Sequence, residues 1–388
     1  MRKKLVQLAI VLAGTALLCF GAVQGAPAQK APEQDEHTGK QGDGQEPQLA
    51  PEPEQEAMAQ VQPEVYRSVE GIQVEAGTRI SVLLREGDSE FAEHFERGCE
   101  QACGDINEAL AYTGKDKVKV SCNAPAKAQD IAGQGAILDE ELNLYPDVMA
   151  VSLVDADSGE VQFDLARENG VSIMGFDAYP KYEDAVAYVG TNNAQAAAEA
   201  ADHLKKAMAS GGLSGSVMIF ANDDTSSNLQ TREAAFTERI SGSDPGYTVS
   251  TVYHLSDLEA KRAEVAAALT AADKDDKEVL PEDLEQEDVI AYLLDAQPDV
   301  AGVFFTDQQA AEAVLPVMAE KMIPAKVVAF GGYEEIAHRA QAQQLAGVIE
   351  ENPYGMGYAT TVAALRVAAL IDQNITVDTG YRWQPAAE

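Results

Sequence analysis

No group of side chains in this sequence has the spacing of a known catalytic or metal-binding motif. The five histidines are scattered, and none lies in the H-E-x-x-H arrangement that places two imidazoles on one helix face to bind zinc. The chain also lacks the G-x-x-x-x-G-K-S/T loop that holds phosphates and the G-x-S-x-G turn that exposes a nucleophilic serine. We therefore expect no enzyme, no bound metal and no cofactor.

Pairs of acidic residues are the remaining candidates for catalysis. Asp155 with Asp157, and Asp223 with Asp224, have the side chains needed for proton transfer. In a chain with 64 acidic residues, however, chance explains such pairs. A secreted glycan hydrolase, which needs two carboxylates in fixed opposition, therefore ranks below a protein that only binds.

The charge of the chain restricts its partners. It holds 28 Lys and Arg against 64 Asp and Glu, which gives a formal net charge of −36. Phosphate backbones repel a protein of this charge, so we expect no nucleic-acid partner.

Three cysteines fall in the main part of the chain. Cys99 and Cys103 stand four residues apart on a predicted helix and so share one face, and Cys122 ends a predicted strand. One of the helical thiols could pair with Cys122. Small buried core residues are the favoured interpretation of all three.

The N-terminus has the pattern of an export signal over residues 1–26. Basic residues at 2–4 precede an apolar stretch from 5 to about 23, and small residues follow at 25–28. Cys19 raises the possibility of a lipid anchor, but Leu18 stands where such sites have a small residue. We expect an extracytoplasmic protein, in the periplasm, in the cell envelope or secreted.

Residues 27–73 predict a disordered acidic stalk. The segment is rich in Pro, Glu and Gln and has few large apolar side chains, so it buries too little surface to offset the entropy lost on ordering.

From about residue 74, short runs of Val, Ile and Phe alternate with stretches of helical periodicity. This alternation predicts parallel sheets covered on both faces, and its length predicts two doubly wound α/β lobes. Ligands of such sheets lie beyond the carboxyl ends of the strands. The predicted strands are 80–84, 118–121, 148–153, 171–176, 186–190, 217–220, 247–252, 300–305 and 327–330.

Gly355 and Gly357 lack the third glycine of a dinucleotide-binding fingerprint, and Pro353 precedes them. We interpret these glycines as a site of close helix packing.

Several segments, in a consistent order, resemble the ribose/galactose-type periplasmic sugar-binding proteins of ABC importers. They are Phe176–Asp177, Tyr188–Asn193 (YVGTNN), Val303–Ala311 (VFFTDQQAA), Val327–Gly332 (VVAFGG) and Leu345–Tyr358 (LAGVIEENPYGMGY). The resemblance implies two lobes joined by three crossovers that close on a sugar. The first lobe would be 74–190 plus 352–374, and the second 191–351 plus 375–388.

The resemblance also implies site residues. Phe91 would supply an aromatic face from the first lobe, and Asp177 would accept hydrogen bonds from sugar hydroxyls. Gln230 stands where these proteins usually have an arginine, and Arg232 is two residues away. The expected ligand-binding set is Phe91, Ser152, Asp177, Tyr179, Gln230, Arg232, Asp307, Tyr333 and Glu351.

Besides Gln230, three positions depart from the pattern of the family. Asp307 replaces the usual Asn, Glu351 the usual Gln, and Gly331 the usual Asp. The changes at 307 and 351 add negative charge, which suits a neutral or amino-bearing polyol better than an acid sugar.

The leading hypothesis is therefore a monomeric solute-binding protein that delivers a small saccharide to ABC permease subunits. An envelope sensor with the same fold, which presents the bound solute to a membrane receptor, remains an alternative. The effector domain of a DNA-binding repressor is disfavoured because the chain has a leader and no basic helix-turn-helix segment.

Overall fold

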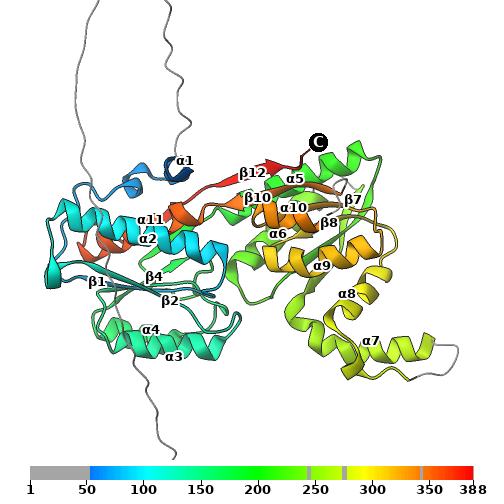
Figure 1. Cartoon of the computed structure of the whole chain (residues 1–388), viewed down its shortest axis with the longest axis horizontal. Helices are drawn as coiled ribbons and strands as arrows, with labels where there is room; N and C mark the ends of the chain where they lie inside the picture. The colour runs from blue at the N-terminus through cyan, green and yellow to red at the C-terminus, as the bar shows by residue number, and fades with distance from the viewer. Residues whose placement is uncertain (1–52, 243–245, 273–277, 341–343, 388) are drawn as a thin grey trace, which may run out of the picture. The chain divides into compact units, whose positions relative to one another are not determined.

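The computed structural model describes residues 53–242, 246–272, 278–340 and 344–387 (Figure 1). The predicted export signal, Cys19 and residues 27–52 of the predicted stalk lie outside the described residues. Within the described residues, no helix combines the length and the apolar character needed to cross a membrane.

The first lobe is built on a six-stranded sheet with the order β11-β5-β4-β3-β1-β2. All neighbouring strands are parallel. Their near-continuous apolar sequences follow from this arrangement, because helices cover both faces. The strands are β1 Arg79–Leu83, β2 Lys119–Asn123, β3 Val148–Val151, β4 Ser172–Phe176, β5 Ala187–Gly190 and β11 Ile375–Asp378.

Two pairs of helices cover this sheet (Figure 1). One face packs against α2 (Glu90–Ala109) and α11 (Pro353–Ala368), and the other against α3 (Ile131–Leu142) and α4 (Glu160–Glu168). A short 3-10 helix, Gly114–Asp116, precedes β2.

The second lobe has a six-stranded sheet with the order β12-β10-β9-β8-β6-β7. Only β12 is antiparallel, and it pairs with β10. The strands are β6 Gly215–Ala221, β7 Tyr247–His254, β8 Val300–Phe305, β9 Lys326–Phe330, β10 Leu345–Glu351 and β12 Tyr381–Pro385.

Helices again cover both faces of the second sheet. One face carries α5 (Asn193–Ser210) and α6 (Ser227–Ser241). The other carries α7 Leu258–Ala272, α8 Gln286–Asp295, α9 Gln308–Glu320 and α10 Tyr333–Arg339. The 3-10 helices Leu255–Asp257 and Pro281–Asp283 flank α7.

The predicted fold class of two parallel-sheet α/β lobes is confirmed, but the predicted boundary between the lobes at residue 375 is wrong. The sequence places residues 375–378 in the second lobe. They form β11, which pairs in parallel with β5 in the sheet of the first lobe. The chain therefore returns to the first sheet before it crosses for the last time.

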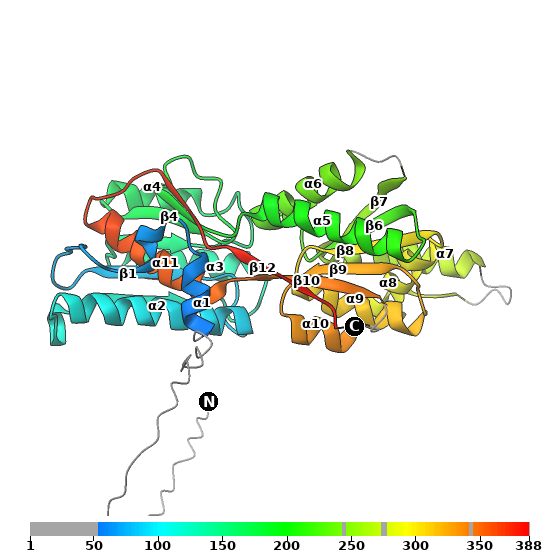
Figure 2. The ribbon, with the colours of Figure 1, turned by 90° about the horizontal axis from the view of Figure 1, so that it is seen from above.

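The chain passes between the lobes three times (Figure 2). The crossings lie between β5 and α5, between β10 and α11, and between β11 and β12.

The last part of the predicted stalk is ordered, which corrects the prediction of disorder over residues 53–73. Helix α1 (Pro53–Gln60) and the 3-10 helix Glu64–Arg67 lie in this segment, where Val61, Tyr66 and Ile72 are buried. The segment also contacts two of the crossings. The Nδ2 of Asn352 donates to the carbonyl of Ala57 at 2.7 Å, and Gln62 and Asp378 exchange backbone hydrogen bonds.

Helices α2 and α11 approach closely, as the glycines of residues 355–357 led us to expect. A Cβ atom on Gly357 would lie 1.9 Å from the carbonyl oxygen of Phe95, and one on Gly98 would lie 2.2 Å from that of Tyr354. Each contact is with backbone, which cannot rotate away. The contact therefore requires glycine on both helices.

We expect Gly98→Ala to lower the free energy of unfolding by about 1–3 kcal/mol or more, because the added methyl overlaps the α11 backbone. Gly104→Ala, on the same helix, is the control. Nothing lies within 4 Å of its added Cβ, so this change should raise stability by up to about 1 kcal/mol through helix propensity. Urea denaturation measures both, and equal effects of the two changes would contradict the close contact.

Candidate functional site

A cavity of about 640 Å³ lies where the carboxyl ends of strands from both sheets meet. Arg85 follows β1, Ser152 follows β3, and Asp177 follows β4 on the first lobe. Asp307 follows β8, and Glu351 ends β10, on the second lobe. Parallel strands direct their carboxyl ends to one edge of a sheet, which explains why residues distant in sequence meet here.

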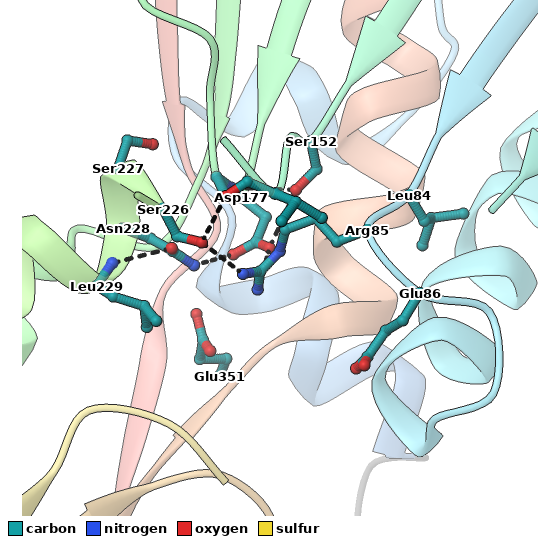
Figure 3. Close-up of polar contacts among 12 residues, drawn as sticks. Leu84, Arg85, Glu86, Ser152, Asp177, Ser226, Ser227, Asn228, Leu229 and Glu351 are labelled. Atoms are coloured by element: carbon teal, nitrogen blue, oxygen red, sulfur yellow. Dashed lines mark hydrogen bonds and ion pairs between the residues drawn. The ribbon is translucent and has the colours of Figure 1, made fainter. Parts of the chain in front are cut away.

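The Asp177 carboxylate joins the two lobes (Figure 3). Its Oδ2 accepts from Ser152 Oγ at 3.2 Å and pairs with Arg85 Nη2 at 3.2 Å, both within the first lobe. Its Oδ1 accepts from Asn228 Nδ2 of the second lobe at 2.8 Å. The Asp177 side chain is only 5% exposed. A buried carboxylate is stable here because all three donors are present.

Arg85 extends the same junction. Its Nη1 donates to Ser226 Oγ of the second lobe at 3.2 Å. Burial by itself would lower the pKa of Arg85, but the neighbouring carboxylates, first among them Asp177 and then Asp223, raise it above its usual value. Arg85 therefore stays charged and bridges the lobes.

The loop before α6 and the first residue of α6 supply further contacts between the lobes. The Oγ1 of Thr225 donates to the carbonyl of Val154 at 2.8 Å, and Ser227 Oγ donates to the carbonyl of Tyr179 at 3.0 Å. On a separate path, Gln309 Nε2 donates to Glu86 Oε1 at 3.1 Å. The described structure is thus one in which the lobes are in polar contact.

Arg232 is buried in the second lobe at the cavity wall. Its guanidinium donates to Asn193 Oδ1 at 2.6 Å, to the carbonyl of Thr306 at 2.9 Å and to Glu351 Oε1 at 2.5 Å. It also lies 4.1 Å from the centre of the Phe330 ring. Arg232 is therefore fully engaged by its own lobe, and it fixes the position of Glu351.

Asp307 caps α9 at the bottom of the cavity. Its Oδ1 accepts from the backbone N–H of Ala310, and its Oδ2 accepts from the N–H of Asn222 and from Thr306 Oγ1. Burial raises the pKa of the Asp307 carboxyl above its usual value, although these donors oppose the rise. The side chain is therefore held in place as an N-cap.

Aromatic rings line the cavity from both lobes. Phe91 and Phe176 contact it, and both stack on the buried Phe95, with ring centroids 6.2 and 4.6 Å apart, respectively. Tyr333 lines the cavity from the start of α10, and its hydroxyl accepts from the N–H of Ala387 at 2.9 Å.

Seven of the nine residues expected from the sequence line the cavity. They are Phe91, Ser152, Asp177, Arg232, Asp307, Tyr333 and Glu351. Tyr179 and Gln230 do not. Tyr179 packs against Tyr188 with ring centroids 4.9 Å apart, and Gln230 Nε2 donates to the carbonyl of Asp224. Each of these side chains therefore makes its contacts within its own lobe and does not line the cavity.

The expected set omits several residues that the structure brings to this site. Arg85 and Asn228 hold Asp177, while Glu86 and Gln309 link the lobes. Arg85, Glu86 and Gln309 lie just beyond the carboxyl ends of predicted strands. Ligands of parallel sheets bind at these ends, so the sequence could have indicated all three residues. Asn228 also lies in the segment that follows a predicted strand, 217–220, but its contact with Asp177 depends on how the two lobes meet.

The cavity lining is strongly acidic. Ten carboxylates line it against three guanidinium groups. Each guanidinium already pairs with a carboxylate: Arg85 with Asp177, Arg232 with Glu351, and Arg382 with Glu350. Across the described residues, no group of His, Cys, Asp and Glu side chains is arranged to hold a metal ion.

Several solved structures share this fold. A carbohydrate transporter solute-binding protein from Agrobacterium radiobacter, in complex with D-arabinose, is 22% identical with a TM-score of 0.61, over 80% of this chain and 95% of that one. A solute-binding protein from Burkholderia graminis, also with D-arabinose, is 19% identical with a TM-score of 0.62, over 81% and 97%. A glucose–galactose binding protein from Geobacillus stearothermophilus is 17% identical with a TM-score of 0.63, over 80% and 97%.

No curated protein matches the sequence. Residues 80–370 match the periplasmic binding protein domain family. The match extends over most of both lobes and includes every residue of the cavity lining except Arg382. The chain therefore belongs to the periplasmic binding protein domain family.

Proposed function

We propose that this protein captures a small saccharide in the cavity between its lobes and delivers it, as a monomer, to the permease of an ABC importer. Membership of its family implies an extracytoplasmic location. The observation that carries the proposal is the cavity itself, which both lobes form at their strand ends and line with carboxylates and aromatic rings.

The lining has the chemistry of sugar recognition. The faces of Phe91 and Tyr333 offer apolar surface to the C–H groups of a sugar ring. Carboxylates such as Glu86 and Glu351 can accept hydrogen bonds from several hydroxyls at once. A volume of about 640 Å³ lies in the range of small-molecule sites. The solved sugar complexes of similar fold support the same ligand class.

The site supports binding rather than hydrolysis. A glycosidase needs one carboxyl group free to give up its proton and a second in fixed opposition to it. Asp177 and Asp307 each accept hydrogen bonds from several protein donors. Those bonds hold these two of the ten lining carboxylates in structural roles, which makes them poor candidates for the proton donor that hydrolysis needs.

The charge of the cavity narrows the ligand class. Every arginine in the lining is already paired, so a carboxylate on the ligand would find no free cation and several like charges. The ligand is therefore a neutral or amine-bearing sugar rather than an acid sugar.

Titration calorimetry tests both the sugar-binding proposal and the preference for uncharged or amine-bearing sugars. The ligands are neutral pentoses and hexoses, their amino derivatives and the matching uronic acids. We expect at least one neutral or amino sugar to bind, and its uronic acid to bind at least about tenfold more weakly, because like-charge repulsion of roughly 1.4 kcal/mol gives that factor. If no sugar releases heat while another class of solute binds, the proposal is wrong. Equal affinity for the acid and neutral forms would refute only the charge argument.

The bond between Asn228 and Asp177 should stabilise the closed arrangement without contacting the ligand, since Asn228 does not line the cavity. We expect Asn228→Ala to weaken sugar binding about tenfold, because the closed form loses a hydrogen bond to a charged group. Small-angle scattering of the ligand-free variant should also show a larger radius of gyration.

The matched control is Gln230→Ala, on the same helix. Gln230 bonds within its own lobe, so affinity and radius should stay at the wild-type values. Weakened binding in this control would restore Gln230 to the site, and unchanged affinity in Asn228→Ala would show that the contact does not stabilise closure.

A further inference from the structure

The three cysteines of the folded body converge on one place, although 23 positions separate the first from the last. Cys99 and Cys103 lie one turn apart on α2, and Cys122 lies on β2. Cys122 is the register partner of Val82 on β1, and parallel partners direct their side chains to the same face. That face packs against α2, so all three thiols belong to one apolar cluster.

Cys103 Sγ lies beside Val118, just before β2, so Cys99, one turn earlier on α2, faces the later part of β2, which holds Cys122. In this structure the Cys99 thiol donates to the carbonyl of Gly357 at 3.3 Å. Burial raises the pKa of the Cys99 thiol well above its usual value, and interaction with the adjacent Cys122 thiol raises it further. Cys103 is held differently. Its Sγ donates to the carbonyl of Val118 at 3.4 Å, and Asn107 Nδ2 lies 3.6 Å from it.

Cys122 lies on the edge strand of the first sheet, which has a neighbouring strand on one side only. This strand, β2, is bonded only to β1, and none of its five residues is fully buried. A groove of about 860 Å³ runs beside it and is lined by Cys103, Val120 and Ser121, among others. A covalent link from α2 would anchor a strand that packing holds on one side only.

We propose that Cys99 and Cys122 form a disulfide bond in the exported protein and that Cys103 stays a free thiol. The oxidant is a protein disulfide, of the kind carried by extracytoplasmic thiol oxidoreductases. The Cys122 thiolate attacks that disulfide and displaces one of its sulfurs. Cys99 then attacks the Cys122 sulfur and displaces the second. The cysteine pair loses two protons and two electrons, and the oxidant gains them as two thiols.

Other uses of the cluster fit less well. A metal site is not formed, since within the described residues no three such ligands are arranged for one. A disulfide between Cys99 and Cys103 would have to span one helical turn, where the Cβ atoms are held about 5–6 Å apart, well beyond the separation a disulfide allows.

The test uses the full chain exported to an oxidising compartment, with peptide mapping by mass spectrometry under non-reducing conditions. We expect a cross-linked pair of peptides holding Cys99 and Cys122, lighter by two hydrogen atoms than the separate peptides. Alkylation of the denatured protein should label Cys103 alone among the three. Alkylation of all three cysteines, or a link from Cys103 to Cys122, would overturn the proposal.

A second measurement does not depend on mapping. Reduction should lower the melting temperature of the wild type by about 5 °C, because the closed loop of residues 99–122 restricts the unfolded chain. Cys103→Ser is the control, and reduction should lower its melting temperature by as much as that of the wild type. Cys122→Ser should melt at the same temperature with and without reductant. A shift that survives in Cys122→Ser would mean that reduction acts elsewhere.

Discussion

The carboxylate of Asp177 is the point at which the two lobes hold each other. It is buried and takes hydrogen bonds from Arg85 and Ser152 on its own lobe and from Asn228 on the other. Separation of the lobes would return Asp177 and Arg85 to water, which solvates both well. The desolvation cost of these two groups therefore opposes their attraction to each other and to the second lobe. A balance of this kind lets a ligand decide whether the lobes stay closed.

The acidic character of the chain has a consequence at this site. Residues that line the cavity carry many more carboxylates than guanidinium groups, and each arginine there is already neutralised by a carboxylate. The field in a cleft lined by one sign of charge repels anions before they make any contact. The selection against acid sugars that we propose would therefore come from the whole lining rather than from a single residue.

Much of the fold could be predicted from the sequence, because buried parallel strands read as apolar runs and alternate with helices. Strands β10 and β12 are absent from the predicted strands, and two further segments were predicted wrongly. Residues 375–378 join the first sheet because β5 has an open edge there, and a pairing between strands so far apart leaves no local trace. Residues 53–73 have the polar composition of a disordered chain, yet Tyr66 is buried and its hydroxyl bonds to Asp372, which lies 306 positions away.

For the site, the sequence by itself determined which residues follow the predicted strands, and Asp177 and Asp307 are among them; Glu351 was expected only from the family resemblance. Only the tertiary structure decided the direction of each side chain. Gln230 and Arg232 are two residues apart, hence about 200° around the axis of α6, so one faces the cavity and the other turns away. The position of Asn228 against Asp177 depends on how one lobe meets the other, a relation between separate folding units that no local pattern encodes.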